Sequence, residues 1–128
     1  MNGNKKPKVL LVEDDMFMVD LLITEFTNAG FDVALAKTGI EALHEYKKSR
    51  PDLILLDLLL PDQNGFDTLR QIRREAGGPE TKVIVLSNLS ETADIEEGRR
   101  LGVLDYLVKA NTALPDIVAR AKSVLGIL

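Results

Sequence analysis

Short apolar runs that recur along the chain constrain its fold more than any other feature of the sequence. Four of them lie at residues 9–12, 53–56, 83–86 and 104–108, and apart from Asp105 they are apolar at successive rather than alternating positions. Strands buried on both faces have this pattern, and they occur in parallel sheets covered by helices on each side. Residues 31–36 form a more alternating run, which predicts a weaker strand nearer an edge of the sheet.

Segments with helical spacing separate these runs. In the first, Val19, Leu22 and Phe26 share one face, and Gly30 follows where the helix should end. The second is expected to open with a capping box in which Thr38 pairs with Glu41. The later helices are expected to begin at or near three further polar residues, namely Asn64, Ser90 and Thr112.

Strands and helices therefore alternate along the whole chain. This order predicts a doubly wound α/β domain in three layers, with five parallel strands, five helices and right-handed crossovers. A chain of 128 residues has the length of one domain. We expect residues 1–7 to form a flexible tail and residues 8–128 to form that single domain.

Composition excludes several classes of function. The chain has no cysteine, so disulfides, thiol catalysis and thiolate metal sites are absent. Its net charge is −4 and its basic residues form no block beyond the tail, which predicts no direct contact with nucleic acid. No apolar run approaches the ~20 residues of a membrane helix, and no signal peptide precedes the first strand. These features predict a cytoplasmic protein without membrane contact.

Chemically complementary residues follow the predicted strands. Glu13 and Asp14 come after the first strand, Asp57 after the third, Ser87 after the fourth and Lys109 after the fifth. In doubly wound sheets, ligands bind at the carboxyl ends of the strands. An all-oxygen cluster of carboxylates suits Mg²⁺, which binds through one or two carboxylates together with phosphate oxygens.

A carboxylate in such a site is a competent nucleophile for phosphoryl transfer. The aspartyl phosphate that it forms requires a metal ion and a fixed cation to offset the charge of the transferred oxygens. Lys109 supplies that cation, and the Ser87 hydroxyl can donate a hydrogen bond to a phosphoryl oxygen. Taken singly, Asp14 or Asp15 would sooner be a helix cap, Ser87 a turn residue and Lys109 a solvated charge. Their joint position at the strand ends favours the functional interpretation.

These motifs together resemble the response-regulator receiver domain of two-component signalling over essentially the whole chain. The matching segments are residues 9–15 (VLLVEDD), 51–61 (PDLILLDLLLP), 64–66 (NGF), 83–87 (VIVLS) and 105–109 (DYLVK). The resemblance implies strand order 2-1-3-4-5 and phosphorylation at Asp57. It also implies Mg²⁺, or Mn²⁺ in its place, bound by Asp14 and Asp57, by Glu13 through water, and by the backbone carbonyl of Leu59.

The resemblance further implies a switch and its partners. Ser87 would move toward the phosphoryl group while Tyr106 changes rotamer, remodelling the face formed by the fourth helix, fifth strand and fifth helix. The phosphoryl donor would be a histidine kinase or a histidine phosphotransfer protein. The switched face would control a downstream effector protein or domain, or a homodimer that forms on phosphorylation.

Two residues depart from the family pattern. A proline usually follows the lysine, whereas Ala110 follows Lys109 here. A small residue commonly follows the switch hydroxyl, whereas Asn88 follows Ser87. We therefore expect an altered turn at Lys109 and an altered entrance to the phosphorylation site.

Two alternative functions stay open at the level of sequence. A small haloacid-dehalogenase-like phosphatase also uses an aspartyl nucleophile and Mg²⁺, but its D-x-D motif would need an aspartate where Glu13 stands. A degenerate receiver would bind partners without phosphorylation, which the presence of Asp14, Asp57, Ser87 and Lys109 disfavours. The preferred interpretation is a regulatory phospho-acceptor that is not an enzyme, and His44, in the middle of a helix, is given no role.

Overall fold

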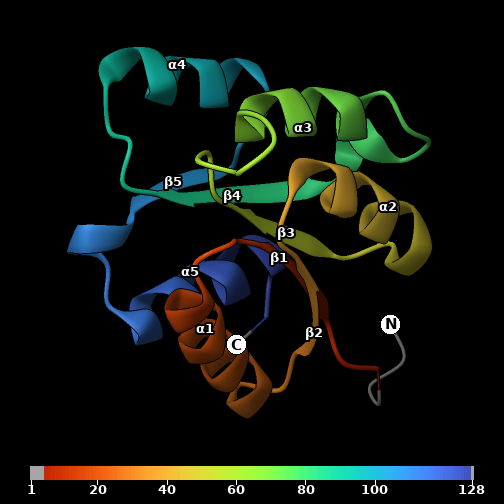
Figure 1. Cartoon of the computed structure of the whole chain (residues 1–128). Coiled ribbons are helices and arrows are strands. Elements are labelled where there is room, and N and C mark those ends of the chain that lie inside the picture. Colours follow the sequence, from red (N-terminus) through yellow and green to blue (C-terminus); the bar gives the residue numbers. More distant parts are fainter. Residues whose placement is uncertain (1–4, 128) are drawn as a thin grey trace.

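A computed structural model describes residues 5–127 and shows one sheet of five parallel strands in the order β2-β1-β3-β4-β5. This confirms the predicted fold class and strand order, and it places the alternating second strand at an edge (Figure 1). The strands are β1 (Lys8–Val12), β2 (Asp32–Ala36), β3 (Leu53–Leu56), β4 (Lys82–Ser87) and β5 (Asp105–Val108).

Helices cover both faces of the sheet. Figure 1 shows α1 and α5 on one face and α2, α3 and α4 on the other, which gives the three predicted layers. The helices are α1 (Met16–Asn28), α2 (Gly39–Ser49), α3 (Gly65–Arg73), α4 (Thr92–Arg100) and α5 (Leu114–Leu125), with short 3₁₀ turns η1 (Gly78–Glu80) and η2 (Lys109–Asn111).

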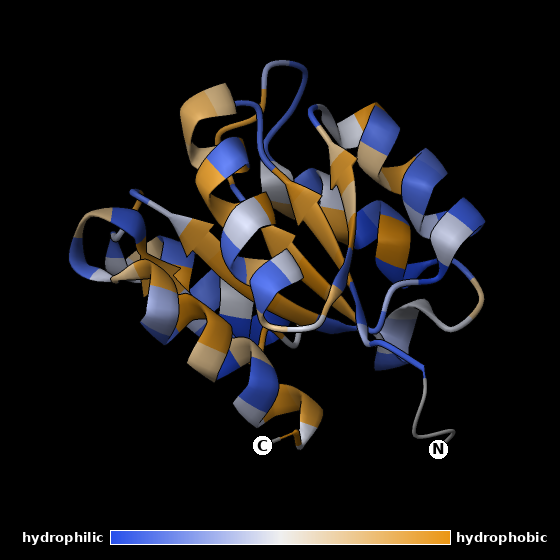
Figure 2. Ribbon diagram, turned by 90° about the horizontal axis from the view of Figure 1, so that it is seen from below, coloured by the Kyte–Doolittle hydropathy of each residue, from blue (hydrophilic) through white to orange (hydrophobic). Residues whose placement is uncertain are grey.

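Two hydrophobic cores lie on the two faces of the sheet, because successive strand side chains point to opposite faces. In β1, Val9 and Leu11 pack into the core beneath α1 and α5, whereas Leu10 and Val12 pack into the core beneath α2 and α3. The strands at the centre of the sheet are accordingly hydrophobic along their length (Figure 2). These cores fix the strand ends that carry the polar site.

Three of the four predicted helix starts are confirmed, and one is displaced. The side chains of Thr38 and Asn64 cap α2 and α3 as expected. Ser90 was predicted to cap the fourth helix, which is wrong: α4 begins at Thr92, after Glu91, and has no side-chain cap. The fifth helix begins at Leu114, near Thr112 as predicted, and the Thr112 hydroxyl donates to the carbonyl of Val108 at 2.9 Å, which closes the preceding turn.

The predicted tail lies largely outside the described residues, as does the last residue of the predicted domain. Residues 1–4 and 128 are not described, and Lys5 and Lys6 are exposed. The carbonyl of Pro7 accepts from the backbone N–H of Asp32 at 2.9 Å, so ordered pairing with β2 begins directly before β1. No helix within residues 5–127 is long and apolar enough to cross a membrane.

Candidate functional site

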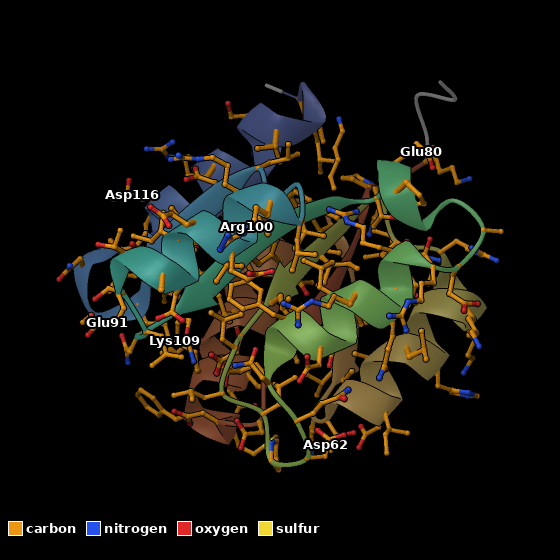
Figure 3. The ribbon with its side chains drawn as sticks, turned by 90° about the horizontal axis from the view of Figure 1, so that it is seen from above. Asp62, Glu80, Glu91, Arg100, Lys109 and Asp116 are labelled. Carbon is orange, nitrogen blue, oxygen red and sulfur yellow. The ribbon has the colours of Figure 1, made fainter. Side chains whose placement is uncertain are left out.

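The residues that follow the strands gather at one end of the molecule. Figure 3 shows Lys109 and Asp62 at this end, with Glu80 at the other. Backbone hydrogen bonds to neighbouring strands hold the first residues of the loops: Glu13 N–H donates to the Ala36 carbonyl, and Asp57 N–H to the Val12 carbonyl, each at 3.0 Å. The sheet itself therefore positions the two buried carboxylates.

Three carboxylates form a cluster at this sheet edge. Ligand oxygens of Glu13, Asp14 and Asp57 all lie within 4.8 Å of one another. Glu13 and Asp57 are buried, with 3% and 5% of their surface exposed, whereas Asp14 is exposed. Burial raises the pKa of Glu13, and the neighbouring charge of Asp57 raises it further, against the lowering effect of Lys109. An all-oxygen donor set of this kind fits a hard divalent cation.

Lys109 reaches into the cluster from the end of β5. Its ammonium donates to Asp57 Oδ2 at 2.9 Å and also pairs with the Glu13 carboxylate. Burial alone would lower the pKa of Lys109, but the hydrogen bonds to Glu13 and Asp57 outweigh it and raise the pKa. The lysine therefore stays charged beside the predicted acceptor.

The two adjacent aspartates after β1 have different surroundings. Asp15 is the N-cap of α1, and its carboxylate accepts from the backbone N–H groups of Phe17 at 3.0 Å and Met18 at 3.5 Å. Asp14 belongs to the carboxylate cluster instead. The resemblance implied that Asp14 is a metal ligand, and the structure places Asp14 in the cluster and Asp15 at the cap.

Ser87 ends β4, beside the acceptor strand β3. It is fully buried, and its Oγ accepts from the backbone N–H of Leu89 at 3.3 Å. In this arrangement its hydroxyl closes a local turn of the loop between β4 and α4. The predicted movement of Ser87 toward a phosphoryl group would have to break or stretch that bond.

The loop after β3 is folded tightly against Asp57. Leu59 N–H donates to Asp57 Oδ1 at 3.2 Å, and Leu59 forms an isolated antiparallel bridge with Asn64. A Cβ on Gly65 would lie 2.4 Å from the Asp57 carbonyl oxygen and 2.8 Å from Leu58 Cα. Glycine is therefore required at position 65 for the loop to return this close to the strand, and the predicted role of the Leu59 carbonyl depends on that loop.

Asp62 is a residue of this loop that sequence reasoning missed. Its carboxylate accepts from the backbone N–H groups of Gly39 at 2.8 Å and Ile40 at 3.1 Å, at the start of α2. The bond from Gly39 lowers the pKa of Asp62 most. The loop is thus anchored to the start of α2, 23 residues away in sequence. A local sequence pattern cannot predict a helix cap supplied from that distance.

Tyr106 lies on β5, and its hydroxyl makes a hydrogen bond within the protein. The hydroxyl donates to the Leu89 carbonyl at 2.5 Å, and its ring packs beside Gly98 of α4. Burial, followed by the charges of Asp94 and Asp57, raises the pKa of Tyr106 to about 12. The switch role predicted for Tyr106 would therefore act on the same loop that carries Ser87.

The two departures noted in the sequence contact each other. The backbone N–H of Ala110 donates to the side-chain oxygen of Asn88 at 3.0 Å. No cis peptide bond occurs in the described chain, so the bond between Lys109 and Ala110 is trans. His44, by contrast, is exposed on α2, away from the site.

Comparison with protein families matches residues 9–122 to the response regulator receiver domain. The chain belongs to this family. The match extends over the acidic cluster, the buried serine and the lysine, and it favours a receiver over the phosphatase alternative. Membership of this family supports a role for the chain in two-component signalling.

Relatives in sequence are longer response regulators. The DNA-binding response regulator MtrA of Mycolicibacterium paratuberculosis is 34% identical over 92% of this chain and 51% of its own length. The probable transcriptional regulator ycf27 of Porphyridium aerugineum is 35% identical over 94% of this chain and 49% of its own. The chain spans about half the length of these curated relatives. DNA binding is thus stated for MtrA, and the lack of nucleic-acid contact remains a prediction for this receiver.

Solved receiver structures share the fold closely. The non-phosphorylated HemR receiver domain of Leptospira biflexa has a TM-score of 0.87 and 30% identity, covering 96% of this chain and 97% of its own. The receiver domain of sensor histidine kinase PA1611 from Pseudomonas aeruginosa has a TM-score of 0.85 and 27% identity, covering 95% and 99%. That structure holds a magnesium ion in its active-site cleft.

Proposed function

We propose that this receiver accepts a phosphoryl group on Asp57 in a Mg²⁺-dependent reaction and transmits that state through the loop that carries Ser87. One observation carries the proposal: the buried carboxylate of Asp57 lies within a cluster of three carboxylates and is bonded by the ammonium of Lys109 at 2.9 Å. A nucleophile, ligands for a divalent cation and a fixed positive charge thus meet at one point.

The metal ion is assigned to this cluster on the chemistry of its donors. Asp14 and Asp57 would supply carboxylate oxygens, Glu13 would act through water, and the Leu59 backbone carbonyl would complete the protein ligands. Asp14 is exposed and so is accessible to a hydrated ion, which suits Mg²⁺ because it retains several waters. Bound there, the ion would neutralise charge on the phosphoryl oxygens.

The transfer step uses a phosphohistidine of a kinase or phosphotransfer protein as donor. A carboxylate oxygen of Asp57 attacks phosphorus, the new O–P bond forms as the N–P bond of the donor breaks, and the leaving imidazole nitrogen takes up a proton from solvent. Lys109 holds Asp57 and then offsets the charge of the transferred oxygens. The receiver keeps the product on itself, so it acts as a regulatory phospho-acceptor rather than as an enzyme that turns over substrate.

Output would follow from the loop between β4 and α4. A phosphoryl group on Asp57 offers an acceptor to the Ser87 hydroxyl, which now closes its own turn with Leu89. The Leu89 carbonyl is also the partner of the Tyr106 hydroxyl. Movement of Ser87 would therefore disturb Tyr106 and the face of α4, β5 and α5, where an effector protein, an output domain or a second receiver would bind.

Intact mass measured after incubation with Mg²⁺ and a small phosphodonor tests this function. Wild type should gain one phosphoryl group, whereas Asp57→Ala should gain none. Asp116→Ala is a matched control, because Asp116 is an exposed aspartate on α5. Continuous hydrolysis of phosphate esters would support the phosphatase alternative, and no adduct with any donor would support a phosphorylation-independent binding module.

A further inference from the structure

A side chain extends the pairing of β4 with β5 beyond the last backbone pair. The final partners in these strands are Ser87 and Val108. One residue after Ser87, the Asn88 side-chain oxygen accepts from the N–H of Ala110, two residues after Val108, at 3.0 Å. The acceptor is an amide oxygen and the donor a backbone amide, so the bond resembles a further rung between the two strands.

Lys109 lies between the two attachments. Val108 before it is paired with β4, and Ala110 after it is bonded to Asn88. The Thr112 hydroxyl, which donates to the Val108 carbonyl at 2.9 Å, closes the same turn from the other side. The backbone of Lys109 is thus fixed on both sides at the residue whose ammonium must reach Glu13 and Asp57.

This attachment depends on the identities of both residues. Position 110 can donate only because it is not proline, and position 88 can accept only because its side chain carries an oxygen at that length. Asn88 is exposed, and the hydrogen bond that its side chain makes within the described residues is the one with Ala110. Its bond to the turn of Lys109 is therefore its distinguishing feature.

We propose that Asn88 is a positioning residue for Lys109, acting through the backbone N–H of Ala110. The kinetic part of this inference rests on the proposed function, in which Lys109 holds Asp57 and offsets the charge of the transferred phosphoryl oxygens. The bond also joins the turn of Lys109 to the loop that carries Ser87 and Leu89. One hydrogen bond therefore connects the turn of Lys109 with the loop of Ser87 at the entrance to the site.

Amide hydrogen exchange measured without metal or phosphodonor tests the bond itself. The Ala110 amide should exchange at least about fivefold faster in Asn88→Ala than in wild type, as expected for loss of one hydrogen bond. Asn88→Asp keeps the acceptor oxygen and should retain the protection. Ser90→Ala is the matched control, because Ser90 is an exposed residue of the same loop. Unchanged Ala110 exchange in Asn88→Ala would overturn the proposal.

Phosphorylation kinetics test whether the bond acts through Lys109. With saturating Mg²⁺ and a small phosphodonor, Asn88→Ala should slow adduct formation about three- to tenfold. In a Lys109→Ala background, Asn88→Ala should have no further effect. Equal slowing in both backgrounds would show that Asn88 acts at the phosphate entrance instead, and would overturn the positioning role.

The two parts of the test separate this inference from the function on which it rests. Absence of any adduct in wild type would refute phosphorylation, and the positioning role would then be decided by relaxation of the Lys109 side-chain nitrogen. In that measurement Asn88→Ala should make the Lys109 ammonium more mobile than in wild type or Ser90→Ala. Equal mobility in all three proteins would overturn the positioning role.

Discussion

The ammonium of Lys109 lies 2.9 Å from Asp57 Oδ2 and is also paired with Glu13, so one cation serves two buried carboxylates. The side chain of Lys109 is only 15% exposed, and those of Glu13 and Asp57 are 4% and 6% exposed. Leaving buried charges without a partner is costly. The lysine is therefore important for stability before any phosphoryl group arrives.

Lys109→Met should lower the free energy of unfolding without Mg²⁺ by about 3 kcal/mol, because two carboxylates lose their common cation. Added Mg²⁺ should then stabilise the variant more than it stabilises wild type, since the metal no longer competes with an ammonium. Thermal unfolding with and without Mg²⁺ measures both effects. A variant that responds to Mg²⁺ less than wild type would contradict this account of the site.

Asp14 and Asp15 should give opposite phenotypes although they are neighbours. Asp14→Ala removes a cluster carboxylate, so it should lose most of the stabilisation by Mg²⁺, which amounts to about 2.7 kcal/mol at one hundred times the dissociation constant. Without metal it should be no less stable than wild type, because like charges are relieved. Asp15→Ala should retain the response to Mg²⁺ but lose about 1 kcal/mol through loss of the α1 cap. Denaturant unfolding with titrated Mg²⁺ measures the pair, and a shared phenotype would refute the assignment.

Gly65 and Gly98 should respond differently to the same change. Gly65→Ala places a Cβ 2.4 Å from the backbone carbonyl oxygen of Asp57, so it should destabilise the domain by about 1–3 kcal/mol and slow phosphorylation. Gly98→Ala is the matched control, because its Cβ would meet its nearest neighbours at 3.6 Å, an ordinary contact, within α4. It should be neutral or stabilising by up to about 1 kcal/mol. Urea unfolding compares the two, and tolerance of Gly65→Ala would disprove the close return of the loop.

The Tyr106 hydroxyl should titrate at a pH well above the pKa of an ordinary tyrosine. Because its pKa is raised to about 12, the folded state holds the phenolic proton more strongly than the unfolded chain does. This contribution to stability is complete below the ordinary pKa near 10 and is lost as pH rises toward 12. Tyrosinate absorbance in wild type minus that in Tyr106→Phe should give the midpoint, with Tyr46→Phe as control. A midpoint near 10 would show that the Tyr106 hydroxyl is not buried in solution as it is in this structure.

The pattern of apolar runs in the sequence was sufficient to predict the architecture and the members of the acidic cluster. The apolar runs at β1, β3 and β4 are buried on both faces, which admits few arrangements other than a covered parallel sheet. Once the strands are parallel, the residues after them must meet at one edge. Glu13, Asp14 and Asp57 could therefore be grouped before the structure was known, and the geometry brings them together.

Contacts between loops were not predictable in the same way. The anchoring of Asp62 on α2 and the bond between Asn88 and Ala110 join segments 23 and 22 residues apart. Each depends on where a loop lies to within a fraction of an ångström, and nothing in local spacing encodes that position. The start of α4 at Thr92, rather than directly after Ser90, was not predictable from a local capping pattern either, because that helix has no side-chain cap.

By itself, the sequence determined the layered α/β fold and the acidic edge, because hydrophobic burial is a large, non-directional effect that short periodic patterns specify. Only the tertiary structure decided that Asp15 caps α1, that Lys109 bridges Glu13 and Asp57, and that Asn88 accepts a hydrogen bond from Ala110 beside Lys109. Hydrogen bonds and ion pairs are short-ranged and directional, so they form only after the packed sheet has fixed the loops in space.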